Sequence, residues 1–270
     1  MLANSVGLAW EAFNAAPGQN GVAGAWVGLL SYAFHIYFDF SGYSDMAVGM
    51  GLMLGFNFPK NFNYPYIANS ITDFWRRWHI TLSGWFRDYV YIPLGGSRRG
   101  AARNLINLVV VWFLTGLWHG ASWNFVLWGL YFAVILIVER TFLLRAFEKI
   151  KLPSFVRQIY AFVLVVVGWG LFAITDLPES FTYIAELFGR SSAQGLLFST
   201  AAMRYAAAYL PTLLLCALAA TPLPKLAWSA LTGERRRYRA LEAAGAFAML
   251  LMCVAAIAAG GYNPFIYFRF

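Results

Sequence analysis

One apolar run, from Leu105 to Val138, constrains the fold more than any other feature of the chain. As a straight helix, its 34 residues would extend about 51 Å at about 1.5 Å per residue, whereas the hydrocarbon core of a bilayer is about 30 Å thick. Gly116 and Gly120 flank His119, so we expect the run to break at the histidine and to fold back. Irregular backbone inside a membrane is tolerated only where it is buried in protein or lines a wet cavity.

The remaining apolar runs indicate that the whole chain lies in a membrane. With 60% hydrophobic and only 12% charged residues, 270 residues cannot cover themselves with polar side chains as a soluble domain would. We therefore predict an all-α integral membrane protein that forms a single membrane domain over residues 1–270. The other apolar stretches are Gly24–Phe38, Phe155–Ile174, Ala201–Ala220 and Ala240–Gly260.

The positive charge of the chain is explained by the membrane rather than by nucleic acid. The net charge is +8, but Lys and Arg are grouped between the apolar runs. Such grouping suits anionic lipid and cytoplasmic loops, and we expect no nucleic-acid partner. The positive-inside rule predicts that Ser97–Arg103, Arg140–Arg157 and Glu234–Arg239 lie on the cytoplasmic side, and that Asp176–Glu186 faces the opposite side.

A polar segment between the first two apolar runs has the pattern of an amphipathic helix. Ser70 and Asp73 have the spacing of a capping box, and an aromatic stripe follows at helical intervals. This pattern predicts one continuous interfacial helix that carries His79 close to its apolar face. A plain membrane anchor is the alternative. The stripe consists of Phe74, Trp78, Leu82 and Trp85.

A second group of polar residues lies in the first apolar run. His35 and Asp39 are four residues apart on one helical face, and Asp45 follows what we expect to be a break at Ser41-Gly42. Acidic residues at this depth should be paired or functional. Three interpretations remain open: a metal site that uses His35, Asp39 and His79, a two-aspartate membrane protease, and structural ion pairing. Arg76 and Arg77 are the candidate partners for such pairing.

Two interpretations are open for His119: an isolated histidine in an apolar helix is usually a satisfied core residue, but the neighbours of this one favour a general base. Trp118 and Trp123 supply aromatic walls, and Ser122 and Asn124 supply hydrogen-bonding groups. A neutral imidazole can accept a proton from a hydroxyl group. Ser122 is a poor candidate for a nucleophile because no GxSxG motif surrounds it.

Three segments carry a resemblance to a known family. They are "DFSGYSDMAVGMG", "NFNYPYIANSITDFWRRWHITLSGWFRDYVYIPLGG" and "GLWHGASWNFVLWGLY", which span about Tyr32 to Tyr131. The chain resembles the membrane-bound O-acyltransferase (MBOAT) superfamily in its bacterial polysaccharide branch. "YIPLGG" and the ending "NPFIYFRF" are more similar to the alginate O-acetyltransferase type than to the D-alanyl transferase that acts on teichoic acid.

The resemblance implies a multi-helix bundle, with interfacial and re-entrant helices, around a central tunnel. In that fold His119 matches the catalytic histidine and His79 matches a second polar position of the active site, whereas His35 matches no functional position. No metal is implied. Members are usually nearly twice as long, so we expect this chain to correspond to the C-terminal portion of the fold. The residues that we expect to bind substrate are Trp78, Trp118, Asn124 and Arg77.

The resemblance also implies a reaction. His119 would take the proton of a hydroxyl group that attacks a thioester, while His79 or a tryptophan N–H would stabilise the oxyanion or orient the donor. The donor would be acetyl-CoA or an acyl carrier on the cytoplasmic side, with no bound cofactor. The acyl group would reach an exported polysaccharide such as alginate, directly or through a periplasmic acetyltransferase partner. A multi-pass protein of the bacterial inner membrane is therefore expected.

Two alternatives stay open at this point. One is a non-catalytic polysaccharide-export or scaffold subunit that retains the fold. The other is a D-alanyl or peptidoglycan acyltransferase.

Overall fold

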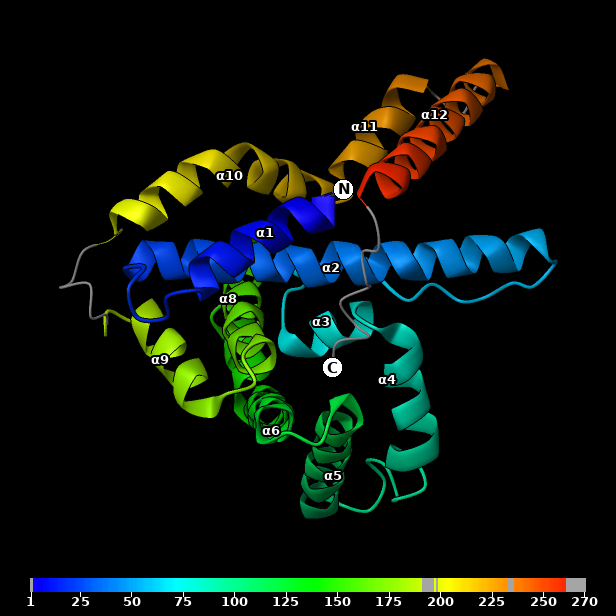
Figure 1. Ribbon diagram of the computed structural model, residues 1–270. Helices are drawn as coiled ribbons and strands as arrows, with labels where there is room; N and C mark the ends of the chain where they lie inside the picture. Colours follow the sequence, from blue (N-terminus) through cyan, green and yellow to red (C-terminus); the bar gives the residue numbers. More distant parts are fainter. Residues whose placement is uncertain (1, 191–196, 198, 233–235, 261–270) are drawn as a thin grey trace.

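The computed structural model describes residues 2–190, 197, 199–232 and 236–260, and the regular structure in that part of the chain is helical (Figure 1). This confirms the all-α prediction. Short 3-10 or π-helical turns lie at Pro65–Ile67, Arg87–Tyr91 and Glu139–Leu143. The α-helices are α1 (Leu2–Asn14), α2 (Val22–Met53), α3 (Ile71–Arg77), α4 (Ile80–Phe86), α5 (Ala101–His119), α6 (Trp123–Val138), α7 (Leu144–Lys149), α8 (Ser154–Ala173), α9 (Leu177–Leu187), α10 (Thr200–Ala219), α11 (Leu223–Thr232) and α12 (Arg236–Gly260).

Within the described residues, five helical segments are long and apolar enough to cross a membrane. They include α5, α8, α10 and most of α12, together with Trp123–Lys149, in which α6 runs through the π-helical turn into α7. The chain is therefore a multi-pass membrane protein. α2 is not among these five, although it is the longest helix of the described part and contains the first apolar run.

The predicted break at His119 is confirmed. α5 ends at His119, Gly120 is extended, and α6 begins at Trp123 after Ser122. α6 then packs back against α5. The close approach requires Gly116, where an added Cβ would lie 2.5 Å from the carbonyl oxygen of Phe125.

α2 is the element around which the other helices are arranged. α1 lies along it, and α8, α9 and α10 also pack against it (Figure 1). Its 32 residues run without interruption through Ser41 and Gly42, so the predicted break at that position is wrong. One glycine inside a helix costs only about 1 kcal/mol relative to alanine, which the rest of a long helix can offset.

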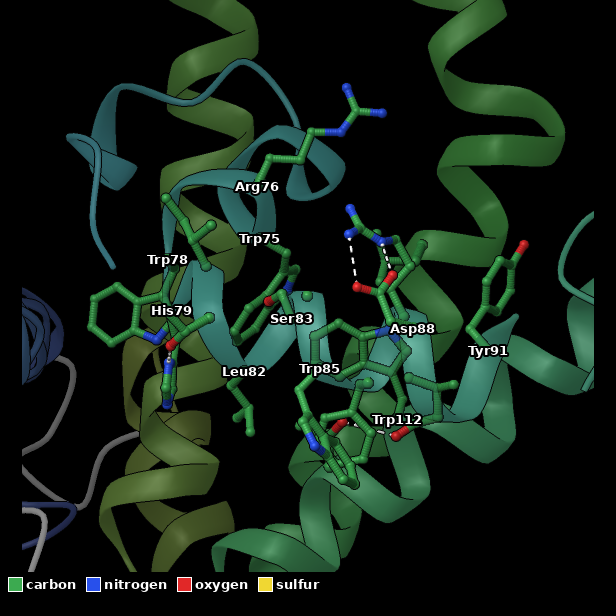
Figure 2. A pocket seen from close by; sticks show the side chains of 18 of the residues that line it. Trp75, Arg76, Trp78, His79, Leu82, Ser83, Trp85, Asp88, Tyr91 and Trp112 are labelled. Atoms are coloured by element: carbon green, nitrogen blue, oxygen red, sulfur yellow. Dashed lines mark hydrogen bonds and ion pairs between the residues drawn. The ribbon is translucent and has the colours of Figure 1, made fainter. Parts of the chain in front are cut away.

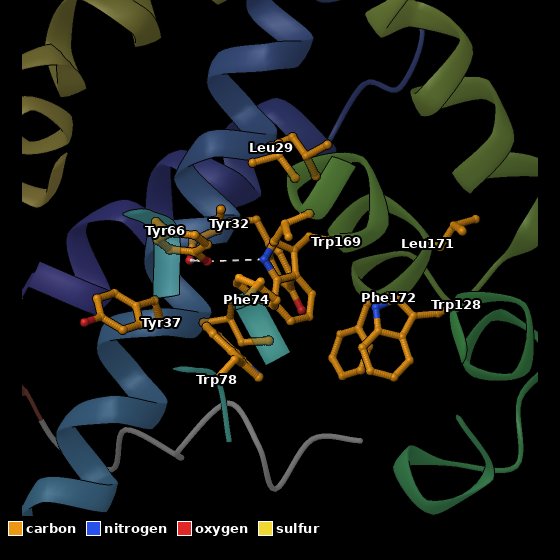
Figure 3. Packing of buried hydrophobic residues seen from close by; sticks show 14 of the residues in the cluster. Leu29, Tyr32, Tyr37, Tyr66, Phe74, Trp78, Trp128, Trp169, Leu171 and Phe172 are labelled. Atoms are coloured by element: carbon orange, nitrogen blue, oxygen red, sulfur yellow. Dashed lines mark hydrogen bonds between the residues drawn. The ribbon is translucent and has the colours of Figure 1, made fainter. Parts of the chain in front are cut away.

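A cluster of buried aromatic rings joins α2, α3 and α8 (Figure 3). Tyr66 donates a hydrogen bond of 2.6 Å to the carbonyl of Ala33 in α2 and accepts one of 3.2 Å from the indole of Trp169 in α8. Phe74 stacks on Trp78, and Trp78 also packs against Trp169 with ring centroids 4.9 Å apart. The hydroxyl of Tyr66 and the indole N–H of Trp169 are thus paired within the core, and the packing holds α3 between the two long helices.

Two carboxylates lie fully buried and bind backbone N–H groups. Glu186 in α9 accepts hydrogen bonds from the backbone of Gly18, Asn20 and Gly21, and thereby holds the loop between α1 and α2. Glu139 binds the first residues of α3 in the same way. Buried charges persist only where such partners compensate the lost hydration.

Candidate active site

The expected continuous helix from Ser70 to Trp85 is interrupted at the second histidine. Ser70 caps α3 as predicted, because its hydroxyl accepts the N–H of Asp73 at 2.9 Å. Trp78 is then extended, and His79 adopts a left-handed conformation with φ 45° and ψ 54°. For a residue with a Cβ this conformation costs about 1–2 kcal/mol. Such strain is typical of functional sites.

A neighbouring loop compensates for the interruption. The N–H of Ile80 donates to the carbonyl of Asn61 at 3.0 Å, and the N–H of Asn63 donates to the carbonyl of Arg77 at 2.9 Å. The loop therefore satisfies backbone groups on both sides of His79. The sequence pattern did not predict the break because these partners lie outside the helical segment.

The imidazole of His79 is held in a mostly buried position. Its Nδ1 lies 3.1 Å from Oδ1 of Asn61, and Phe40 packs edge-on against the ring with centroids 4.7 Å apart. Burial lowers the pKa of His79 from 6.5 to about 4. The imidazole is therefore neutral at neutral pH.

The imidazole of His119 projects from the end of α5 into an aromatic enclosure. The ring centroids of Trp118, Trp128 and Phe172 lie 4.9, 5.0 and 5.1 Å from that of the histidine, and each ring meets it edge-on. Trp128 and Phe172 are fully buried. α6 and α8 thus supply the apolar walls for a histidine that α5 positions.

Both histidines line one cavity of about 840 Å³. Figure 2 shows the side chains of α3 and α4 around this cavity together with Trp112 of α5. Three cationic side chains also line it, and one of them, Arg87, is paired with Asp88 at 2.7 Å. His79 and Thr81 also line a second cavity of about 420 Å³, which includes Ser44 and Asn61. Further residues of the first cavity are Trp75, Trp78, Trp85, Arg76, Arg140, Leu108 and Thr115.

The four residues expected to bind substrate do not all line the cavity. Trp78 lines the larger cavity, and the half-exposed ring of Trp118 lies between the two histidines, 6.1 Å from His79. Asn124 is fully buried and donates to the carbonyl of Leu171 at 3.3 Å, so it links α6 to α8. Arg77 forms an ion pair with Asp73 at 2.9 Å and does not line either cavity. The roles of all six predicted site residues stay predictions.

His35 lies away from this cavity. It packs against α1, where a Cβ added at Gly7 would lie 2.8 Å from its Cε1. Among the described residues, no group of three or more His, Cys, Asp or Glu side chains could hold a metal ion, so the proposed cluster with Asp39 and His79 does not form. Arg77 is paired with Asp73 within α3, rather than with an aspartate of α2.

Sequence reasoning missed three residues that shape the site. Asn61 and Thr81 contact the imidazole of His79, and Arg140 supplies a cation to the cavity wall. The carboxylate of Glu139 was also missed, although an acidic residue directly after an apolar run is itself a signal of a buried partner. Asn61 carried no comparable signal, because its partner lies 18 residues further along the chain.

The fold and the cavity define a class of protein: a multi-pass α-helical membrane protein with two histidines at one cavity. The chain belongs to the MBOAT, or membrane-bound O-acyltransferase, family, whose model matches residues 8–178.

The curated proteins that are similar to the chain include alginate O-acetylases and a peptidoglycan O-acetyltransferase. The chain is 50% identical to a probable alginate O-acetylase of Azotobacter vinelandii over 61% of this chain and 32% of the relative. It is 39% identical to a protein of the same description from Pseudomonas putida, over 93% of this chain and 55% of the relative. A peptidoglycan O-acetyltransferase of Helicobacter pylori is 42% identical over 61% of this chain and 32% of its own length. The chain thus spans about half the length, or less, of the curated relatives that it matches.

Proposed function

We propose that this chain carries the active site of a membrane O-acyltransferase that transfers an acetyl group to the hydroxyl of an exported polysaccharide. The observation that carries the proposal is the cavity shared by His79 and His119. Membership of the MBOAT family and the acetyltransferase descriptions of the relatives support the same reaction class.

The proposed chemistry is a direct acyl transfer. The hydroxyl oxygen attacks the thioester carbonyl, a C–O bond forms and the C–S bond breaks. His119 takes the hydroxyl proton and then returns it to the leaving thiolate, a role that contributes about 10²–10⁴ in rate. The aromatic rings packed against His119 leave fewer directions from which water can approach it, which would slow hydrolysis of the thioester.

The proposals for the acyl donor, the acceptor and the membrane rest on the relatives and on the residues that line the cavity. We propose acetyl-CoA or an acyl carrier as the cytoplasmic donor, because Arg76 and Arg140 offer cations for phosphate groups at the cavity wall. We propose an alginate-type polymer as the final acceptor, reached directly or through a periplasmic acetyltransferase partner. A bacterial inner membrane is the location that this route requires.

Replacing His119 by glutamine tests the proposal. In cells that make the polymer, His119→Gln should leave the amount of protein in the membrane unchanged and should remove polymer acetylation almost completely. His35→Gln is the matched control and should have almost no effect on acetylation. A non-catalytic export or scaffold role predicts instead that acetylation falls only with the amount of protein. Normal acetylation in an abundant His119→Gln protein would refute the catalytic role.

A further inference from the structure

The amide of Asn61 has only one orientation that satisfies its neighbours. The atom assigned as Oδ1 lies 3.2 Å from the backbone N–H of Thr81, which can only donate a hydrogen bond. On the other side of the group, Nδ2 donates to the hydroxyl of Ser44 at 3.0 Å. The oxygen of Asn61 therefore faces Thr81 and His79, and the amide nitrogen faces α2.

This orientation determines which nitrogen of His79 carries the proton. Nδ1 of His79 lies 3.1 Å from the same Oδ1, and a carbonyl oxygen can only accept. Nδ1 must therefore be the N–H of the ring. The hydroxyl of Thr81 is 2.9 Å from that oxygen and 3.4 Å from Nδ1, so its shorter contact is also with Asn61. A neutral imidazole has one N–H, which leaves the lone pair on Nε2.

We propose that Asn61 is a positioning residue: it holds His79 as the Nδ1–H tautomer, so that Nε2 presents a hydrogen-bond acceptor to the substrates. This inference rests on the proposed function, in which His79 either stabilises the oxyanion or orients a substrate. Oxyanion stabilisation needs an N–H, and this tautomer has none on Nε2. His79 therefore orients a substrate through an N–H or O–H group, which is an amide of the thioester donor or a hydroxyl of the acceptor.

Nitrogen-15 NMR of the histidine side chains tests the tautomer directly. The chain has only three histidines, so single His→Gln variants of the labelled full chain in lipid nanodiscs assign every signal. At neutral pH His79 should show a protonated Nδ1 and an unprotonated Nε2. A protonated Nε2 on neutral His79 would overturn the inference.

Substitutions at Asn61 test its role in setting the tautomer. Asn61→Ala removes the acceptor and should give a mixture of the two tautomers, whereas Asn61→Asp keeps an acceptor oxygen and should retain Nδ1–H. Thr81→Val is the control, because it removes a hydroxyl but leaves the contact between Asn61 and His79 intact. An unchanged tautomer in a folded Asn61→Ala protein would show that another group sets it.

Kinetics then identify the group that His79 holds. Asn61→Ala should raise the KM for one substrate several-fold more than Thr81→Val does: the KM of the thioester if an amide is bound, or that of the hydroxyl acceptor if a hydroxyl is bound. If Asn61→Ala and Thr81→Val had the same KM for the thioester and the same KM for the hydroxyl acceptor, the orienting role would be refuted. Because NMR reads the tautomer without turnover, an active His119→Gln variant would refute the proposed function and leave the tautomer assignment standing.

Discussion

The buried carboxylate of Glu139 accepts a hydrogen bond of 2.6 Å from the backbone N–H of Ile71, although 68 residues separate the two in the chain. It also accepts the N–H and the hydroxyl of Thr72, at 2.9 and 2.8 Å, and the hydroxyl of Tyr160 at 3.2 Å. The first N–H groups of a helix have no partners within the helix, and they favour a negative charge. Because α3 leads directly to His79, this carboxylate holds the N-terminal end of the helix that precedes the histidine.

Glu139→Ala should therefore destabilise the protein. Each buried donor that loses its acceptor costs about 1–3 kcal/mol, and at least two backbone N–H groups lose theirs. Thermal unfolding of the purified protein in detergent measures the effect as a lowered melting temperature. Glu148→Ala is the matched control, since Glu148 is exposed in the same stretch of chain and should be nearly neutral. Equal stability of the two variants would contradict the structural role of Glu139.

Gly116→Ala should separate α5 from α6 and disturb the position of His119. The new Cβ would lie 2.5 Å from the carbonyl oxygen of Phe125 and 3.2 Å from the Cα of Val126, and both of these are backbone atoms that cannot rotate away. Overpacking of this kind typically costs about 1–3 kcal/mol. We expect a lower melting temperature and a loss of acetylation.

A second helical glycine provides the control for that substitution. Gly245 in α12 has nothing within 4 Å of an added Cβ. Gly245→Ala should be neutral or slightly stabilising, because alanine is about 1 kcal/mol more favourable than glycine inside a helix. A fully active and stable Gly116→Ala protein would show that the two helices pack less closely than described.

The orientation in the membrane is tested by labelling of single cysteines. In a background without Cys216 and Cys253, a membrane-impermeant thiol reagent added from the periplasmic side should fail to label Ser97→Cys and should label Thr182→Cys. Both positions are exposed, so protection at Ser97 would report the side of the membrane rather than burial. The reverse pattern would invert the orientation inferred from the basic loops.

Glu234 and Arg235 of the third basic loop lie outside the described residues.

Local properties of the sequence were sufficient for the helical class and for two of the helix ends. The run from Leu105 to Val138 had to break because its length exceeds the thickness of a bilayer, and the glycines around His119 placed the break. The hydroxyl of Ser70 predicted the start of α3 because a helix cap involves residues only three apart.

The arrangement of the site was decided by the tertiary structure. The spacing of Phe74 and Trp85 predicted one continuous helix. The helix is interrupted at His79, because the backbones of Asn61 and Asn63 form hydrogen bonds with the chain on both sides of the histidine. The side chain of Asn61 contacts Nδ1 of His79 and is the group that we propose determines its tautomer. Glu139 anchors the first residues of α3, the helix that precedes His79. Such hydrogen bonds join groups that are distant in the chain and form only when folding excludes water from them. The sequence alone could therefore single out the two histidines expected at the site, while the fold determines where each one lies and which groups surround it.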